Sequence, residues 1–370
     1  MNIDLTRTDS PAFSLSLSGR DISANITPRL ISLSLTDARG FEADQLDIEL
    51  DDADGKLDLP TRGAKIKLAL GWKGGLMVDK GDYTVDEIEH SGAPDKITLR
   101  ARSADLRAGI AQRKERSFHG KTLGEIIRTL AEANGLTAVI PPELSDRKVP
   151  HLDQQGESDI ALATRLAGEW DAIATVKAGR LLFIRAGDAT TASGLPMPPV
   201  AILRRDGDSH RFSIADRDNY TAVRAYWQDI DNGKRGEVLV DKNTQFERKN
   251  QVGKRGKVLK TKKLTVTQRE AIEASADNIK QLRHTYASEN TAWQGARSAW
   301  EKLQRGVASF EITLARGRPE IMPELPATVQ GFKPAIDACS WIIASVTHTL
   351  DDNGLITRLA LEMKLEDMAS

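Results

Sequence analysis

The acidic run Asp51-Asp52-Ala53-Asp54-Gly55-Lys56 is the stretch of the sequence that comes nearest to a metal-binding loop. A calcium loop of the EF-hand type has glycine at its sixth position and a bidentate glutamate at its twelfth. With Gly55 in the sixth position, Leu50 is first and Thr61 is twelfth, and neither supplies a carboxylate. The run is therefore predicted to be a solvent-facing β-turn.

The histidines and the single cysteine form no catalytic or metal-binding pattern. Neither HExxH nor another tight metal spacing occurs, so the histidines are predicted to lie on the surface or beside strands. They are His90, His119, His151, His210, His284 and His348. Cys339 stands next to apolar residues and is predicted to be a buried, inert thiol, and one cysteine excludes an intramolecular disulfide.

Nucleotide chemistry has no support either. The sequence contains neither a Gly-x-Gly-x-x-Gly turn that opens a helix nor a Gly-Lys-Ser/Thr loop, so we expect no cofactor, no metal, no catalytic residue and no small-molecule substrate. Paired carboxylates for glycoside cleavage stay open, because their separation is spatial and the chain has 53 acidic residues. A cell-wall-degrading enzyme is therefore kept as an alternative to a protein without catalytic activity.

A basic run is the strongest candidate for electrostatic binding. Residues 248–263 contain eight Lys or Arg and no acidic residue. The run is predicted to be a loop, and three roles stay open: a solvated loop, a contact with an acidic protein, or a contact with nucleic acid. The nucleic-acid role is weakened because the run lacks aromatic residues for base stacking. The candidate interaction residues are Arg248, Lys249, Lys254, Arg255, Lys257, Lys260, Lys262 and Lys263.

Composition limits the partners. The 370 residues are too many for one core and predict two or three domains, and the net charge of −1 gives no global attraction to nucleic acid. We find no signal-peptide pattern at the first residues and no apolar stretch of the length that spans a membrane. The sequence therefore predicts synthesis in a cytoplasm and no membrane partner.

The periodicity of apolar residues predicts a mainly β fold with α+β insertions. Alternating strands and short turns favour a first small antiparallel β-barrel over residues 1–114. An α/β module is predicted for 115–190, with helices starting after Thr122 and at Ser158. A second, related barrel is predicted for 191–370, with the basic loop 248–263 and a helical segment at about 267–305.

Two hairpins look like copies of one unit. One begins at Tyr83 and turns at 91–94, and the other begins at Trp341 and turns at 351–354. In each, the aromatic residue precedes a histidine by seven positions, His90 and His348 respectively. The pattern predicts a duplicated β-barrel, and a duplicated fold without catalytic residues indicates an architectural protein.

Several segments resemble the phage late control D proteins. Glu157-Ser158-Asp159 and 177–181 are similar to the middle domain of that family, and the stretch from Trp341 to His348 is similar to its closing barrel. The resemblance extends over nearly the whole chain. Glu157, Ser158, Asp159, Trp341 and His348 carry its most specific parts.

The resemblance implies a hub in the baseplate of a contractile phage tail, similar to the N-terminal part of type VI secretion spike proteins. In such a hub two barrels per chain form a homotrimeric ring with pseudo-sixfold symmetry, which joins a sixfold tail tube to a threefold spike. The implied partners are a separate trimeric spike protein, the tail tube, other baseplate proteins and a tape-measure protein, and the implied location is the virion. Glu157, Ser158 and Asp159 are predicted to cap a helix, with a functional role as the alternative.

A DNA-retention assay separates the nucleic-acid alternative from the other interpretations of the basic run. Because the whole chain is nearly neutral and the run has no stacking residues, we expect no retention on DNA that depends on Lys254, Arg255 and Lys257. Retention at low salt that is lost when these three residues are replaced by Glu would instead establish DNA binding.

Overall fold

The computed structural model describes residues 10–40, 43–103, 110–177, 179–187, 197–214, 220–229, 233–252, 258–268, 278–305 and 308–363. The chain divides into two compact units. The larger contains residues 1–167, 172–213 and 308–370, and the smaller contains 168–171 and 214–307. The expected domain boundaries near 114 and 190 stay predictions.

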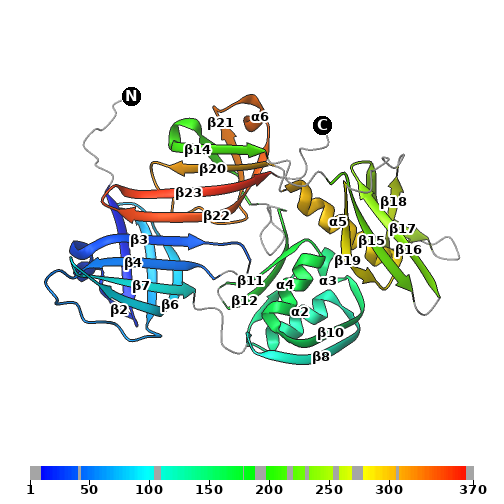
Figure 1. Cartoon of the computed structure of the whole chain (residues 1–370), viewed down its shortest axis with the longest axis horizontal. Helices are drawn as coiled ribbons and strands as arrows, with labels where there is room; N and C mark the ends of the chain where they lie inside the picture. Colours follow the sequence, from blue (N-terminus) through cyan, green and yellow to red (C-terminus); the bar gives the residue numbers. More distant parts are fainter. Residues whose placement is uncertain are drawn as a thin grey trace. The chain divides into compact units, whose positions relative to one another are not determined.

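The larger unit is built on one continuous, mostly antiparallel sheet of thirteen strands (Figure 1). Its N-terminal strands are β1 (Pro11–Leu17), β2 (Arg20–Asp21), β3 (Leu30–Asp37), β4 (Gln45–Asp51), β5 (Lys65–Trp72), β6 (Met77–Ser91) and β7 (Lys96–Ser103), with the short α1 (Ser23–Ile26) and η1 (Thr27–Arg29) between β2 and β3. Its C-terminal strands are β13 (Val200–Leu203), β14 (Gly207–Ile214), β20 (Ala308–Leu314), β21 (Pro326–Gln330), β22 (Ser340–Asp351) and β23 (Gly354–Met363), with η2 (Arg204–Asp206) and α6 (Pro334–Asp337).

The two halves of this sheet repeat one arrangement. Neighbouring strands follow the order β3-β4-β7-β6-β5-β1 in the first half and β14-β20-β23-β22-β21-β13 in the second. Each hairpin also has a β-bulge three residues after its leading aromatic, at Asp86 after Tyr83 and at Ala344 after Trp341. A bulge bends its strand, which lets β6 and β22 pair with different neighbours at their two ends. We call these halves repeat 1 and repeat 2.

The repeats are not two closed barrels. No sheet among the described strands closes on itself, because β22 of repeat 2 pairs with β3 of repeat 1 over Val346–Asp351 and Ser32–Asp37. This pairing uses the strand edges that a separate barrel would need for its own closure. The red strands β22 and β23 and the blue strand β3 lie side by side in Figure 1.

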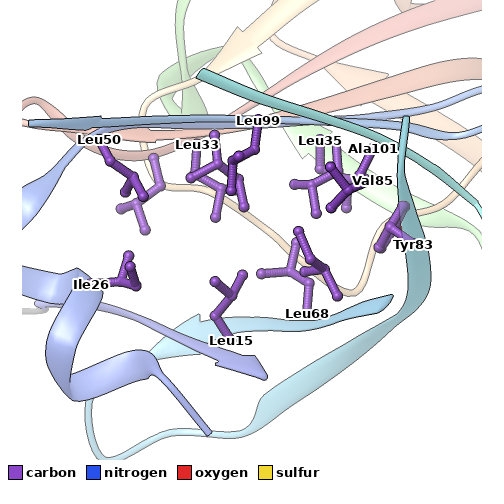
Figure 2. Packing of buried hydrophobic residues seen from close by; sticks show 14 of the residues in the cluster. Leu15, Ile26, Leu33, Leu35, Leu50, Leu68, Tyr83, Val85, Leu99 and Ala101 are labelled. Atoms are coloured by element: carbon purple, nitrogen blue, oxygen red, sulfur yellow. The ribbon is translucent and has the colours of Figure 1, made fainter. Parts of the chain in front are cut away.

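The core of repeat 1 lies between two layers of strands (Figure 2). Leu33, Leu35 and Leu99 project from one layer toward Leu15 and Leu68 of the other. Alternation puts every second residue of β3 and β4 inside, as the sequence pattern predicts. Leu350 and Leu355, from the hairpin tip of repeat 2, belong to this same core.

The α/β module contains the two helices that the sequence predicts, together with further elements. Its strands are β8 (Arg113–Thr122), β9 (Thr137–Val139), β10 (Lys148–Ser158), β11 (Ala172–Lys177) and β12 (Arg180–Arg185), and its helices are α2 (Leu123–Glu132), α3 (Pro142–Ser145) and α4 (Asp159–Glu169). Helix α2 begins with a capping box, in which Thr122 Oγ1 accepts from Glu125 N and Thr122 N donates to Glu125 Oε2. Its apolar side, including Ile126 and Ile127, is buried.

The smaller unit corrects the predicted helical segment at about 267–305. Its strands are β15 (Ala222–Asp229), β16 (Lys234–Asp241), β17 (Thr244–Val252), β18 (Val258–Gln268) and β19 (Ile279–Tyr286), and the helix α5 covers only Glu289–Arg305. Residues 279–286 form a strand because β15 pairs with them in parallel. Ala292 and Ala296 of α5 are fully buried in a cluster with Val223 and Val240.

The basic run is likewise not simply a loop. Residues 248–252 and 258–263 lie in β17 and β18, which pair antiparallel with Lys249 opposite Lys263 and Asn250 opposite Lys262. Lys254, Arg255 and Lys257 lie outside the described residues.

The leading aromatics of the two hairpins should carry much of the stability of their repeats. Tyr83 and Trp341 are 2% and 0% exposed, so Tyr83→Ala and Trp341→Ala should each lower the free energy of unfolding by about 3–5 kcal/mol through the cavity left behind. Guanidinium unfolding followed by circular dichroism measures the loss. Leu76→Ala is the matched control, because Leu76 is 82% exposed, and a similar loss there would contradict the assignment.

Candidate assembly interface

Trp341 holds the start of β22 in the core of repeat 2. Its ring centroid lies 5.6 Å from that of Phe310 and 6.2 Å from that of Phe212, the latter edge-on. The indole Nε1 donates to Ile336 O at 3.2 Å, so the ring's polar atom is satisfied within a dry site. The residue therefore fixes the strand that joins the two repeats.

His348 is fully buried, which corrects the expectation of a surface histidine. Lys80 Nζ lies 3.2 Å from its Nε2, and Thr357 Oγ1 lies 2.9 Å from its Nδ1. A lysine ammonium can only donate, so Nε2 accepts and Nδ1 carries the proton of a neutral ring. Burial, followed by the charge of Lys80, lowers the pKa of His348 to about 3.

Lys80 belongs to repeat 1 and His348 to repeat 2, so their contact is part of a seam between the repeats. Here the repeat seam means the β3–β22 pairing together with three cross-contacts. The first is Lys80 with His348 and Pro319 O. In the second, Trp72 Nε1 donates to Gly317 O at 3.0 Å, and in the third the Arg316 guanidinium lies 4.5 Å from the Trp72 ring centroid.

An ionic clamp lies at another point of the same unit. Arg39, which follows β3, has Nε 2.5 Å from Glu324 Oε1 and donates from Nη1 to Glu362 Oε2 at 2.8 Å. Gly187 N, from the end of the module, donates to Glu324 Oε2 at 3.2 Å. Burial raises the pKa of Glu324, although the Arg39 charge opposes this. The clamp thus links both repeats and the module.

The trio Glu157, Ser158 and Asp159 does more than cap a helix. Ser158 Oγ accepts from Ala161 N at 3.1 Å, which is the predicted cap, and Glu157 pairs with Arg165 in the second turn of the helix. Asp159 is the first residue of α4 and is 1% exposed. Its expected capping role stays a prediction, and the structure adds contacts with side chains of other elements.

Asp159 binds four side chains from three other elements or their ends. Lys114 Nζ, Gln154 Nε2 and Asn134 Nδ2 donate to it at 2.7, 3.0 and 2.7 Å, and Arg116 donates as well. Burial pushes the pKa of its carboxyl upward, but these hydrogen bonds and the Arg116 charge outweigh burial and hold it below the usual value. Asp159 therefore fastens α4 to β8, β10 and the end of α2.

The remaining candidate residues for metal binding or catalysis do not come together in the part of the chain that the structure describes. The described residues contain no group of three or more His, Cys, Asp or Glu able to hold a metal ion. Residues 51–56 form a turn, in which Asp54 pairs with Arg29 at 2.7 Å. The expectation that this turn faces solvent was wrong for Asp52, which is buried and accepts from Leu57 N. Cys339 is half-buried rather than buried, and its thiol donates to Ala335 O. In the described part of the chain, no helix has the length and apolar character needed to cross a membrane.

Two strand edges correspond in position to the two edges that pair in the repeat seam. Neither of them has a partner among the described strands. β14 ends the sheet, so its outer edge is unpaired there. The distal part of β6, Glu87–Ser91, pairs with β7 on one side, whereas β5 reaches only as far as Thr84 on the other. An unpaired edge of this kind is a template for pairing with a strand of another chain.

Comparison with known proteins identifies the family. The sequence model described as "Phage tail baseplate hub (GPD)" matches residues 43–354. The chain belongs to the phage tail baseplate hub family. The "probable baseplate hub proteins" of Escherichia phage 186 and Escherichia phage P2 are 48% and 45% identical to this hub over 100% of the chain and 97% of each relative.

Solved structures share the fold of the hub. The tail protein from Neisseria meningitidis MC58 superposes with a TM-score of 0.64 at 13% identity, over 95% of this chain and 96% of that one. The E. coli c3393 protein, a component of the type VI secretion system, superposes with a TM-score of 0.52 at 12% identity, over 92% of the hub and 74% of that chain. The hub is therefore a phage tail protein of the virion, with its function in the baseplate.

Sequence reasoning singled out His348 of the repeat seam, and Trp341 at the start of the same strand. It missed Lys80 and Gly317 of the seam and Glu324 of the clamp, whose partners are remote in sequence. Trp72 gave one signal, because Gly71-Trp72 resembles Gly331-Phe332 ahead of the second hairpin. The side chains of residues 248–263 lie outside what the structure describes, so the interaction role expected of the basic run stays a prediction.

The neutral His348 makes stability depend on pH. In the unfolded chain its pKa is ordinary, about 6.5, so as pH falls the unfolded state binds the proton first. The contribution of His348 to the free energy of unfolding is therefore constant above about pH 6.5. Below that pH the contribution falls by about 1.4 kcal/mol per pH unit, until the folded pKa of about 3 is reached. Unfolding free energies measured from pH 7.5 to 4.5 should show this loss.

His348→Gln keeps an amide that can contact Lys80 and Thr357 but cannot titrate. Its stability should decline less steeply than that of the wild type below pH 6.5. His284→Gln, at an exposed histidine, is the control and should keep the wild-type slope. Equal slopes for wild type and His348→Gln would show that His348 does not carry the effect.

Proposed function

We propose that the hub is a non-enzymatic homotrimeric ring in which each copy joins the next through a second seam like the one inside the chain. The observation that carries the proposal is the pair of unpaired edges described above. The distal part of β6 corresponds to the part of β22 that pairs with β3, and β14 corresponds to β3 itself.

The correspondence can be followed residue by residue. Aligning the two bulges makes Ile88 equivalent to Val346, since Ile88 pairs with Leu99 and Val346 with Leu359. One strand further, Leu99 pairs with Ile48 and Leu359 with Ile312. Pairing thus repeats across three successive strands of each repeat.

The register of β14 completes the correspondence. The hydroxyls of Ser213 and Ser309 lie 2.7 Å apart, and Ala315 N donates to Asp206 O at 3.0 Å. This register makes His210 equivalent to Leu33 and Ile214 equivalent to Asp37. In the seam Val346 pairs with Asp37, so between copies Ile88 would pair with Ile214.

This pairing would cover exposed apolar surface. Ile214 is 65% exposed and Phe212 and Ile88 are half-buried in the single chain. Burying such side chains while pairing the backbone of two strand edges provides both the apolar and the hydrogen-bonding contribution that stable association needs. The second seam would therefore remove an aggregation-prone edge as well as build the ring.

Three copies would give six similar seams, three within chains and three between them. Such a ring is threefold by symmetry and nearly sixfold in structure, which suits a sixfold tail tube on one side and a separate threefold spike on the other. Other baseplate proteins and a tape-measure protein complete the proposed partners. The name of the E. coli c3393 protein, which mentions similarity to the T4 bacteriophage tail proteins gp27 and gp5, supports this assignment.

Mass in solution tests the ring. Light scattering over a range of concentrations, with and without a candidate spike protein, should give three times the 40.5 kDa chain mass, alone or as a 3:3 complex. Ile214→Asp puts a charge into the proposed seam and should weaken association about tenfold or more, whereas Leu76→Asp, at another exposed leucine, should not. A chain that stays monomeric throughout would refute the ring.

A further inference from the structure

We propose that an acidic knob on repeat 1 of one copy fills a cationic, aromatic pocket on repeat 2 of the next copy. The acidic knob comprises the turns 51–56 and 92–95. The pocket is lined by Arg204, His210, Phe212, Gly331, Phe332, Lys333 and Ile336. The inference rests on the proposed ring and specifies which surfaces meet.

The pocket combines aromatic walls with positive charge. Its volume is about 450 Å³. The His210 and Phe332 rings meet edge-on at 5.0 Å, and the Arg204 guanidinium lies 5.7 Å from the Phe332 ring centroid. Within the described part of the chain, neither Arg204 nor Lys333 has a carboxylate within ion-pair distance. The pocket is therefore suited to a carboxylate-bearing loop.

The acidic knob is one connected structure. Asp52 N donates to Asp95 O at 3.0 Å, which ties the two turns together, and His90 Nε2 lies 3.7 Å from Asp52 Oδ2. Asp95 is exposed, and among the described residues only His90, at 4.0 Å, comes within ion-pair distance of its carboxylate. Asp95 can therefore bind a cation on another chain without giving up a Lys or Arg partner.

The equivalence of the repeats brings these surfaces together. In the repeat seam the tip residues Leu350 and Leu355 pack over Leu33. Their equivalents in repeat 1 are Gly92 and Asp95, and the equivalent of Leu33 is His210. The tip of one copy would thus lie over His210 of the next, which lines the pocket.

A second contact of the seam leads to the same pair of surfaces. Arg316 and Gly317 follow β20 and contact Trp72. The equivalent residues after β4 are Asp52 and Ala53. Ile66 pairs with Tyr83 as Ala327 pairs with Trp341, which makes Lys333, in the pocket lining, the equivalent of Trp72. Two separate correspondences therefore place both turns of the acidic knob against the pocket.

The chemistry of the two seams differs in a way that suits assembly. The tip inside the chain is apolar and buried, with Leu350 5% and Leu355 1% exposed, whereas the tip offered to the next copy carries a carboxylate. Charge across an interface fixes register, excludes wrong partners and is screened by salt. The contact between copies should be selective and sensitive to salt, and the contact within the chain should not.

Charge reversal tests the contact. Asp95→Lys and Lys333→Glu should each weaken trimer formation about tenfold or more in sedimentation at about 0.1 M salt, and the double variant should recover most of the loss. Asp352→Lys is the matched control, because Asp352 is an exposed aspartate at the equivalent tip of repeat 2 and should leave association unchanged. Recovery in the double variant also excludes misfolding as the cause.

A cysteine pair gives an independent measurement. In a Cys339→Ser background, Asp95→Cys combined with Lys333→Cys should form covalent dimers and trimers under mild oxidation, whereas Asp352→Cys combined with Lys333→Cys should not. A wild type that forms trimers, with variants that associate equally well and cysteines that do not cross-link, would overturn this contact alone. A wild type that is monomeric at every concentration would overturn the ring and the contact together.

Discussion

The pairing of β22 with β3 is the interaction on which the rest of the larger unit depends. It makes one sheet from two repeats, and it consumes edges that would otherwise close each repeat separately. Backbone groups at such an edge must find partners, and here they find them in the other half of the same chain. The tip of repeat 2 can therefore serve as part of the core of repeat 1.

Polar residues near this junction are arranged to avoid an uncompensated buried charge. His348 stays neutral beside Lys80, and Arg39 is matched by Glu324 and Glu362. Removing one partner of such a set costs more than the set contributes, because the remaining charge stays buried. The same reasoning applies to Asp159 in the module, where two cations and two amides surround one carboxylate.

Local patterns in the sequence predicted much of this fold. Period-two alternation revealed the hairpins at Tyr83 and Trp341, and the Thr122 and Glu125 spacing revealed the start of α2. The predictions that failed concern residues whose structure depends on partners far away in the chain. Residues 279–286 are a strand because β15 accepts them, and His348 is buried because β3 and Lys80 cover it, the latter 268 positions away. No local pattern contains that information.

The bulges at Asp86 and Ala344 bear on the ancestry of the molecule. A bulge interrupts a hydrogen-bonded ladder, and its placement at the same distance from the leading aromatic in both repeats indicates one inheritance rather than two inventions. In the proposed ring, a chain with a single repeat would have offered one edge of each kind, and six identical copies would have closed it. Gene fusion would then have halved the number of chains and allowed the two repeats to diverge, so that the proposed ring could keep sixfold order on one face and adopt threefold order on the other.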